Sequence, residues 1–236
     1  MANNSIRIAL VGRRLPHNEN LGLCYLRAAL TQAGVQVDVH YVNDGAELAR
    51  AVVAILASAP AIVGLSLADG GSAILPLALG EAIHRAGYGG HVTAGGQFAT
   101  LARGWLLERY PWLDSVVRFA GEAPIVALAA RLARGAGVDA IAGLTTRAGD
   151  GAPAPVLDRS AITLVPLRDE LPEILGQRAA HMIASRGCAG RCQYCGPAAL
   201  QTLERAEGAQ DGHDAQALRA AGVGSVRRRA VEPLCA

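Results

Sequence analysis

The first 135 residues alternate short apolar runs with amphipathic stretches, and this alternation limits the possible fold more than any other feature. Each apolar run predicts a strand, and each is followed by a pattern with helical spacing. The expected strands cover 6–12, 35–42, 61–67, 90–96 and 115–121, and the expected helices cover 20–34, 46–58, 72–87, 98–111 and 122–135. Consecutive strand–helix units give parallel strands with helices on both faces. The sequence therefore predicts an α/β domain with a doubly wound parallel five-stranded sheet of the flavodoxin-like type.

The composition excludes several classes of protein. A hydrophobic fraction of 51% with 18% charged residues excludes a disordered chain. The 22 basic residues, all arginine, nearly balance the 20 acidic ones, so no nucleic-acid partner is expected. The apolar stretch 51–68 is interrupted by Pro60, which argues against a bilayer span. The start of the chain shows no secretory signal pattern, and we expect a cytoplasmic protein without a membrane partner.

The character of the chain changes after residue 135. The turn-rich stretch 137–160 indicates a small hairpin or linker, and 181–187 indicates a new strand that leads to a group of cysteines. A helix is expected at 196–210, whereas the remaining residues give no fold signal. The predicted organisation has three parts, 1–136 as an α/β domain, 137–180 as a linker or hairpin, and 181–236 as the start of a second domain.

The loops that follow the predicted strands are the expected ligand site, because doubly wound sheets bind ligands at the carboxyl ends of their strands. The first loop reads GRRLPH and lacks the glycine pattern of a dinucleotide site, and the chain has no lysine for a P-loop. The loops 68–72 and 94–97 each contain a glycine pair. Such small residues either leave a groove for a long ligand tail or only form tight turns. Both interpretations stay open at this point.

Cys188, Cys192 and Cys195 form a C-x3-C-x2-C motif. Without an export signal, clustered cysteines indicate metal ligands more than disulfides. Three thiolates can hold three irons of a 4Fe–4S cluster and leave the fourth iron open. The alternative is a structural zinc site, which needs a fourth ligand such as His181 or Cys235.

The segments HNENLGLCYLRAAL, LSLADGG, TAGGQFAT and FAGEAP resemble the cobalamin-binding domain of cobalamin-dependent radical SAM enzymes. This resemblance implies that the loops after the third and fourth strands receive the nucleotide tail of the corrinoid. The residues that it places near cobalamin are Ser66, Gly70, Gly71, Gly95, Gly96 and Gln97. The first loop lacks the D-x-H-x-x-G motif, so no histidine of this chain is expected as a lower cobalt ligand.

The cysteine spacing, with Tyr194 before the last cysteine, resembles the signature of the radical SAM superfamily. The resemblance implies that Cys188, Cys192 and Cys195 bind a 4Fe–4S cluster whose open iron chelates S-adenosylmethionine. Tyr194 would lie beside the adenine. An electron from a donor such as flavodoxin or ferredoxin would cleave S-adenosylmethionine to a 5′-deoxyadenosyl radical, which would act on a small-molecule substrate.

Two functional hypotheses follow from these resemblances. The first is an enzyme that performs methyl transfer or rearrangement in biosynthesis, with no catalytic residue assigned. The second is a truncated, catalytically inert corrinoid-binding module. A (β/α)8 barrel runs to about 250 residues, so 181–236 is expected to form only an incomplete start of a radical SAM barrel.

Overall fold

A computed structural model describes residues 6–14, 17–153, 164–181, 183, 192 and 194–210 of the chain. By compactness the chain divides into two units, Met1–Ile183 and Ala184–Ala236. The predicted three-part division at residues 136 and 180 stays a prediction.

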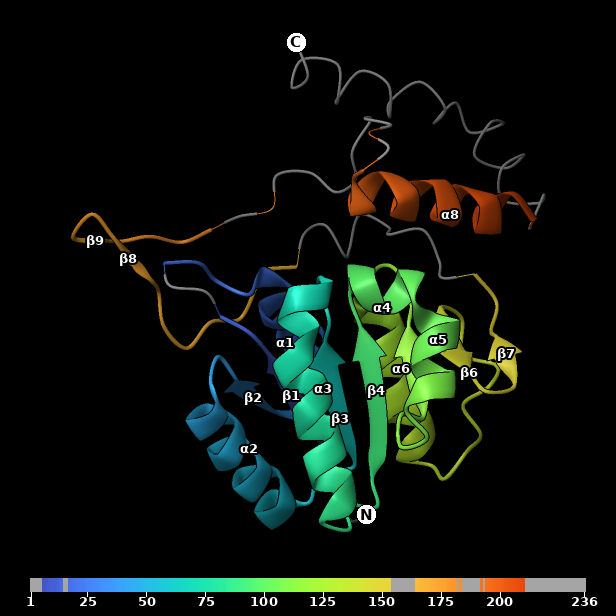
Figure 1. The fold of residues 1–236 in the computed structure, drawn as a ribbon, viewed down its shortest axis with the longest axis horizontal. Helices are drawn as coiled ribbons and strands as arrows, with labels where there is room; N and C mark the ends of the chain where they lie inside the picture. Colours follow the sequence, from blue (N-terminus) through green and yellow to red (C-terminus); the bar gives the residue numbers. More distant parts are fainter. Residues whose placement is uncertain are drawn as a thin grey trace. The chain divides into compact units, whose positions relative to one another are not determined.

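The first unit is built on a mixed seven-stranded sheet in the order β2-β1-β3-β4-β5-β6-β7 (Figure 1). Strands β1 to β5 are parallel, and β6 and β7 are antiparallel. Their bounds are β1 (Arg7–Gly12), β2 (Gln36–Tyr41), β3 (Ile62–Ser66), β4 (His91–Gly95), β5 (Ser115–Val117), β6 (Leu144–Thr146) and β7 (Gly149–Asp150). The α/β class and the mostly parallel sheet are confirmed, whereas the expected count of five strands is not.

The sheet is larger than the five strands expected from the sequence. The hairpin of β6 and β7 pairs with β5, so that Val116 lies opposite Thr145 and Val117 opposite Leu144. Without this hairpin, β5 would present an unpaired edge of backbone groups. The hairpin predicted within 137–160 is therefore part of the sheet itself.

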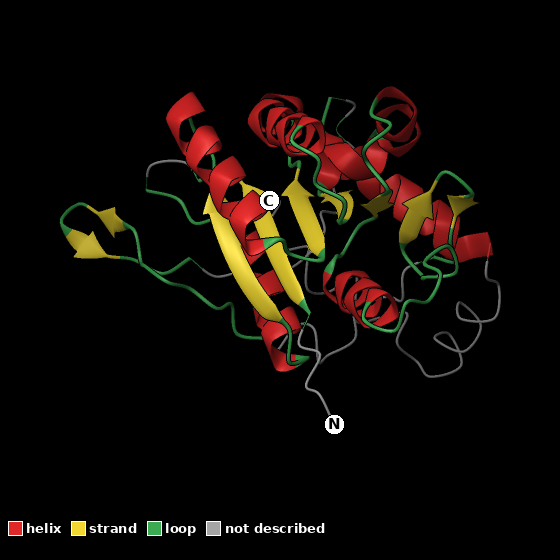
Figure 2. Cartoon of the chain, turned by 90° about the horizontal axis from the view of Figure 1, so that it is seen from below, coloured by secondary structure: helices red, strands yellow, loops and turns green. Residues whose placement is uncertain are grey.

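Helices cover both faces of the sheet (Figure 2). One face carries α2 (Gly45–Ser58), α3 (Gly70–Arg85), α4 (Gln97–Leu101) and α5 (Arg103–Arg109), and the other carries α1 (Leu21–Gln32) and α6 (Glu122–Leu132). The continuous helix expected at 98–111 is instead two short helices on either side of Ala102. The strands β1 and β3 are buried between the two helical layers, as their unbroken apolar runs predict. Strand β2 lies at the sheet edge and is only half buried.

Two further elements follow the sheet along the chain. A short hairpin of β8 (Glu173–Ile174) and β9 (Gln177–Arg178) belongs to the first unit, and α8 (Gly196–Gln210) belongs to the second. Helix α8 coincides with the helix expected at 196–210. Of the strand expected at 181–187 the structure describes only His181 and Ile183, which are not in a strand, and most of the expected barrel start lies outside the described residues. Within the described part of the chain, no helix combines the length and apolar character that a membrane crossing requires.

Candidate cofactor-binding edge

The loops that follow β1, β3, β4 and β5 all lie where these parallel strands end, and we call this side of the sheet the carboxyl edge. All six residues predicted to contact cobalamin are found there. Ser66 and Gly95 are paired as the last residues of β3 and β4. The remaining four open the helices that follow, with Gly70 and Gly71 at the start of α3, and with Gly96 and Gln97 at the start of α4.

Gly96 is glycine because the fold requires it. Its φ of 105° is in the left-handed region, and a Cβ on this residue would lie 2.6 Å from the carbonyl oxygen of Leu67. The Leu67 carbonyl also accepts a hydrogen bond of 3.1 Å from the backbone N–H of Phe98. The turn after β4 therefore packs directly against the backbone that follows β3.

Gly70 and Gly95 are different, because the packing of the chain does not explain them. Neither has a positive φ. A Cβ on Gly70 would meet no atom within 4 Å, and a Cβ on Gly95 would make only an ordinary contact of 3.6 Å with Val117. Gly70 is exposed and Gly95 partly exposed. Their small size leaves open backbone surface at the ends of β3 and β4.

The loop after β3 is fixed by a capping box at the start of α3. The Asp69 carboxylate accepts a hydrogen bond of 2.8 Å from the backbone N–H of Ser72, and the Ser72 hydroxyl accepts one of 3.0 Å from the Asp69 N–H. Hydrogen bonds from the Ser72 backbone and side chain lower the pKa of Asp69. This carboxylate is thus occupied with the helix end, and the exposed loop around Gly70 has a defined shape.

Arg13, the first residue after β1, carries an unsatisfied donor. Its Nε is buried and has no hydrogen-bond partner among the described residues. Its positive charge also helps to lower the pKa of Asp69. Arg13 in the loop after β1 therefore acts on the carboxylate in the loop after β3. Arg13 was not among the residues predicted from the sequence to bind a ligand. Its position as a basic residue directly after a central strand could have indicated such a role.

The ends of β1 and β2 are covered by a segment of the connection between the two expected domains. We call residues 164–181 the strap. The backbone N–H of Leu167 donates a hydrogen bond of 3.1 Å to the Cys24 carbonyl of α1. Arg27 of α1 forms an ion pair of 2.5 Å with Asp169, and Arg14 forms one of 3.6 Å with Glu170. Beside these contacts lies a pocket of about 20 Å³, lined by the strap, the first loop, α1 and β2, with room for about one water molecule.

Glu19, in the loop after β1, makes the most connections to the strap. Its side chain is only 5% exposed. Its carboxylate binds the guanidinium of Arg168 and accepts a hydrogen bond of 2.6 Å from the backbone N–H of His181. Burial acts to raise the pKa of Glu19, but the hydrogen bonds from His181 and Arg168 outweigh it and lower that pKa. Glu19 thus anchors both ends of the strap while ionised.

The histidines of this region are engaged elsewhere or lie away from the loops. His17 is exposed, and its Nδ1 lies 2.8 Å from the Glu173 carbonyl oxygen. His40 lies within β2 opposite Val11, and burial lowers its pKa. The ring of His181, considered above as a zinc ligand, contacts Glu19 at 3.2 Å through Nδ1.

In the second unit the structure describes two of the three clustered cysteines. The backbone N–H of Cys195 donates a hydrogen bond of 3.1 Å to the Cys192 carbonyl, and the Cys195 carbonyl accepts one of 3.1 Å from Ala198 at the start of α8. Both thiols are free, and Cys192 is exposed. Tyr194 between them is 92% exposed. Cys188 and Cys235 lie outside the described residues, so the cluster and the contact of Tyr194 with S-adenosylmethionine stay predictions.

Several solved structures share this fold. The chain is similar to the cobalamin-dependent S-adenosylmethionine radical enzyme OxsB with aqua-cobalamin and S-adenosylmethionine bound, with 20% identity and a TM-score of 0.57 over 65% of this chain and 23% of that chain. It is also similar to the radical S-adenosylmethionine methyltransferase TsrM from Kitasatospora setae with cobalamin and a 4Fe–4S cluster bound, with 20% identity and a TM-score of 0.52 over 64% of this chain and 31% of that chain. This chain therefore spans less than a third of either protein. No curated protein matches it.

The predicted resemblance to cobalamin-dependent radical SAM enzymes is confirmed at the level of the fold, because OxsB and TsrM share it. At this identity the two structures establish the fold alone. The model of the B12 binding domain family matches residues 8–129, which reach from β1 to α6 and make up just over half of the chain. This match supports cobalamin binding, and on its strength the chain belongs to the B12 binding domain family.

Proposed function

We propose that this chain binds cobalamin at the carboxyl edge, over the ends of β3 and β4. The observation that carries the proposal is the pair Gly70 and Gly95, whose lack of a side chain is not required by backbone conformation or by packing. In a member of the B12 binding domain family, this open surface is where a long ligand tail can approach the backbone.

The residues at the edge fit the chemistry of the cofactor. Cobalamin carries amide and phosphate oxygens around its periphery, and Arg13 has a buried N–H with no partner among the described residues. Such a donor gains a hydrogen bond when it meets an acceptor. Ser66 and Gln97 add a hydroxyl and an amide at the ends of the same two strands. When bound, cobalamin supplies a cobalt centre that can carry a methyl group.

In this proposal the chain's own residues bind and orient the cofactor. The loop around Gly70, fixed by Asp69 and Ser72, and the turn at Gly96 form the two walls against which the tail lies. The strap contacts α1 and the first loop beyond Arg13, and so limits the ligand to Arg13 and the ends of β3 and β4. No histidine of the first loop is proposed as a lower cobalt ligand.

We further propose that Cys188, Cys192 and Cys195 hold a 4Fe–4S cluster that binds S-adenosylmethionine, with Tyr194 beside the adenine. The support is the C-x3-C-x2-C spacing together with the free thiols of Cys192 and Cys195 in a turn that leads into α8. The amino end of a helix favours the thiolate form that ligates iron. With an electron donor and a small-molecule substrate, such a pair of cofactors supports methyl transfer or rearrangement.

The test is reconstitution of the full chain under anaerobic conditions with hydroxocobalamin, iron and sulfide. We expect bound corrinoid, detected by its absorbance after gel filtration, and about four irons per chain, the number in one 4Fe–4S cluster. A chain that retains no corrinoid would contradict the first proposal. Iron retention that is unchanged by Cys→Ala substitution at all three positions would contradict the second. After addition of S-adenosylmethionine and a one-electron reductant, bound corrinoid and iron without formation of 5′-deoxyadenosine would favour the inert binding module.

A further inference from the structure

Phe119, in the loop between β5 and α6, has an unusual backbone conformation. Its φ is 55°, in the left-handed region that glycine adopts without strain and bulky residues rarely adopt. Glycine would relieve the strain, yet the chain has an aromatic residue at this position. Non-glycine residues in such conformations gather at ligand-binding and active sites, where other contacts hold them in place.

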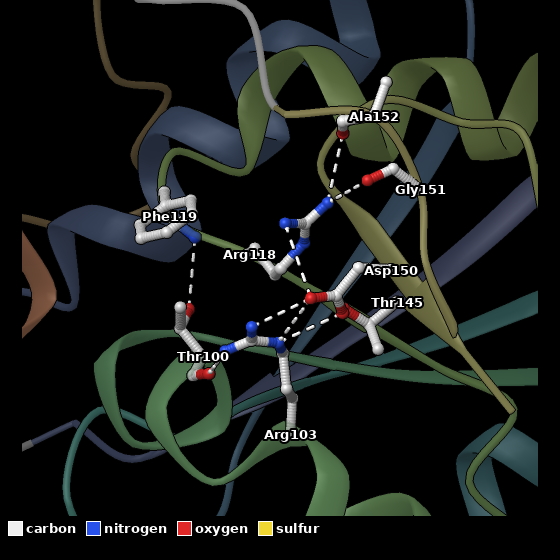
Figure 3. A network of polar contacts seen from close by, with 8 residues as sticks. All are labelled: Thr100, Arg103, Arg118, Phe119, Thr145, Asp150, Gly151 and Ala152. Atoms are coloured by element: carbon white, nitrogen blue, oxygen red, sulfur yellow. Dashed lines mark hydrogen bonds and ion pairs between the residues drawn. The ribbon is translucent and has the colours of Figure 1, made fainter. Parts of the chain in front are cut away.

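A single threonine connects Phe119 to the glycine turn of the proposed cobalamin site. The Thr100 hydroxyl is fully buried and donates a hydrogen bond of 2.9 Å to the Gly96 carbonyl. It also accepts one of 3.1 Å from the Phe119 N–H (Figure 3). Because both bonds use the same oxygen atom, the turn after β4 and the loop after β5 are held in a fixed relation. Phe119 therefore belongs to the same rigid edge as Gly96.

The residue before Phe119 is fixed from the opposite direction. Arg118 is only 1% exposed and donates hydrogen bonds of 2.6 and 3.0 Å to the carbonyls of Gly151 and Ala152. Its guanidinium also lies 3.9 Å from Asp150, which forms a further ion pair of 2.8 Å with Arg103 (Figure 3). The backbone at residues 118 and 119 is thus held by the hairpin of β6 and β7 on one side and by α4 on the other.

The ring of Phe119 is not explained by the core. Within the described residues it belongs to neither hydrophobic cluster of the sheet, and the residue is partly exposed at the carboxyl edge. Gly121, two residues further on, has little room for a side chain, because its Cβ would lie 3.1 Å from the Leu26 side chain. Phe119 is therefore the large apolar side chain of this loop that can reach a ligand.

We propose that Phe119 is a ligand-contacting residue whose ring packs against the bound cobalamin, an inference that rests on the proposed function above. The corrin and the nucleotide base of cobalamin both present flat surfaces of low polarity. An aromatic ring contributes dispersion and stacking to such a surface with few side-chain torsions to restrict. The strained backbone at residue 119 then serves to aim that ring.

The experiment compares cobalamin affinity and thermal stability in Phe119→Gly, Phe119→Ala and Ala59→Gly variants of the full chain. Ala59, with a φ of 41° at the end of α2, is the matched control, because its replacement also removes left-handed strain but lies at the opposite edge of the sheet. Hydroxocobalamin binding is measured by absorbance titration, and unfolding of the ligand-free chain is followed by circular dichroism.

We expect Phe119→Gly to raise the unfolding temperature while it weakens cobalamin binding about three- to tenfold. Phe119→Ala should weaken binding to the same extent without the gain in stability, and Ala59→Gly should gain stability with unchanged affinity. Affinity that stays at the wild-type value in both Phe119 variants would overturn the inference while leaving the proposed function intact. A wild-type chain that does not bind hydroxocobalamin would instead overturn the proposed function and the inference with it.

Discussion

The two halves of the carboxyl edge are built in opposite ways. At β1 and β2, charged side chains of the first loop and of α1 hold the strap across the strand ends. At β3 and β4, exposed Gly70 and partly exposed Gly95 leave the backbone open. Both halves belong to the same sheet, so the difference lies in the loops and in what covers them. A fold of this type offers a ligand several strand ends, and the strap leaves only some of them available.

The two halves also use similar helix starts for different purposes. Asp44 caps α2 and is followed by Gly45, just as Asp69 caps α3 and is followed by Gly70. In both cases a Cβ on the glycine would meet no atom within 4 Å. The pair is a natural internal control, because a side chain added at either position meets the same local geometry.

The largest effect is expected where the closed half is opened. Glu19→Ala removes the buried carboxylate that binds Arg168 and His181, at a local cost of about 3 kcal/mol. We expect the amide hydrogens of the strap to exchange about a hundredfold faster, with the exchange of β1 and β3 unchanged. Hydrogen exchange read by mass spectrometry measures this.

The control for this variant is Glu170→Gln, which alters an ion pair on the same strap whose carboxylate is 74% exposed. Such a pair contributes little, so exchange of the strap should stay at the wild-type rate. Equal exchange in the Glu19 and Glu170 variants would show that Glu19 does not hold the strap.

The open half is tested by adding a side chain to it. Gly70→Leu places a bulky group on the surface where cobalamin is proposed to bind, and we expect affinity to fall about 10- to 100-fold. Gly45→Leu adds the same group at the end of β2 and should leave affinity unchanged. Cobalamin affinity is measured by hydroxocobalamin titration. An equal loss of affinity in the two variants would show that the ligand does not prefer the open half of the edge.

A smaller effect is expected at the boundary between the halves. Arg13→Gln shortens the side chain and removes the charged guanidinium, whose Nε has no hydrogen-bond partner among the described residues. A hydrogen bond from a charged donor contributes about 1.5–3 kcal/mol, and one lost contact of this kind should weaken cobalamin binding about tenfold. Arg14→Gln, at the next residue but on the strap side, is the control. A loss that appears only in the Arg14 variant would contradict the proposed role of Arg13.

Acid should open the strap in a way that depends on Glu19. Because the folded pKa of Glu19 is lowered, its contribution is fully present above its usual pKa of 4.5 and is lost as pH falls through the lower folded value. The groups that face it are Arg168 and His181 from the strap and Cys24 from α1. Strap exchange in wild type should accelerate below about pH 4.5, after correction for intrinsic rates. In Glu19→Gln this additional acceleration should be absent.

Much of the fold could be predicted from periodicity, but the site could be predicted only in part. The buried strands β1 and β3 are recognisable in the sequence as unbroken apolar runs. Strands β6 and β7 have only three and two residues, which is too short for an alternating apolar pattern to be detected. The glycines at 70, 95 and 96 look alike in sequence. Only the backbone separates Gly96, which the turn requires, from Gly70 and Gly95, which it does not.

Other parts of the site depend on contacts between distant residues. Glu19 and Arg168 are separated by 149 positions, so no local pattern connects them. The left-handed conformation of Phe119 is likewise invisible in sequence, because the residue type argues against it. Arg13 was visible in the first loop, but its unsatisfied donor became apparent only from its burial.

The buried Arg118 has a consequence for where this domain can be divided. The family match ends at residue 129, but the guanidinium of Arg118 is neutralised and hydrogen-bonded by residues 150–152, and β5 takes its outer partner from β6. A fragment cut after the family match would lose both these acceptors and the strand that pairs with β5, and we expect it to be less stable than the longer piece. The contacts that complete this domain therefore extend past the region that family membership recognises, at least to Ala152.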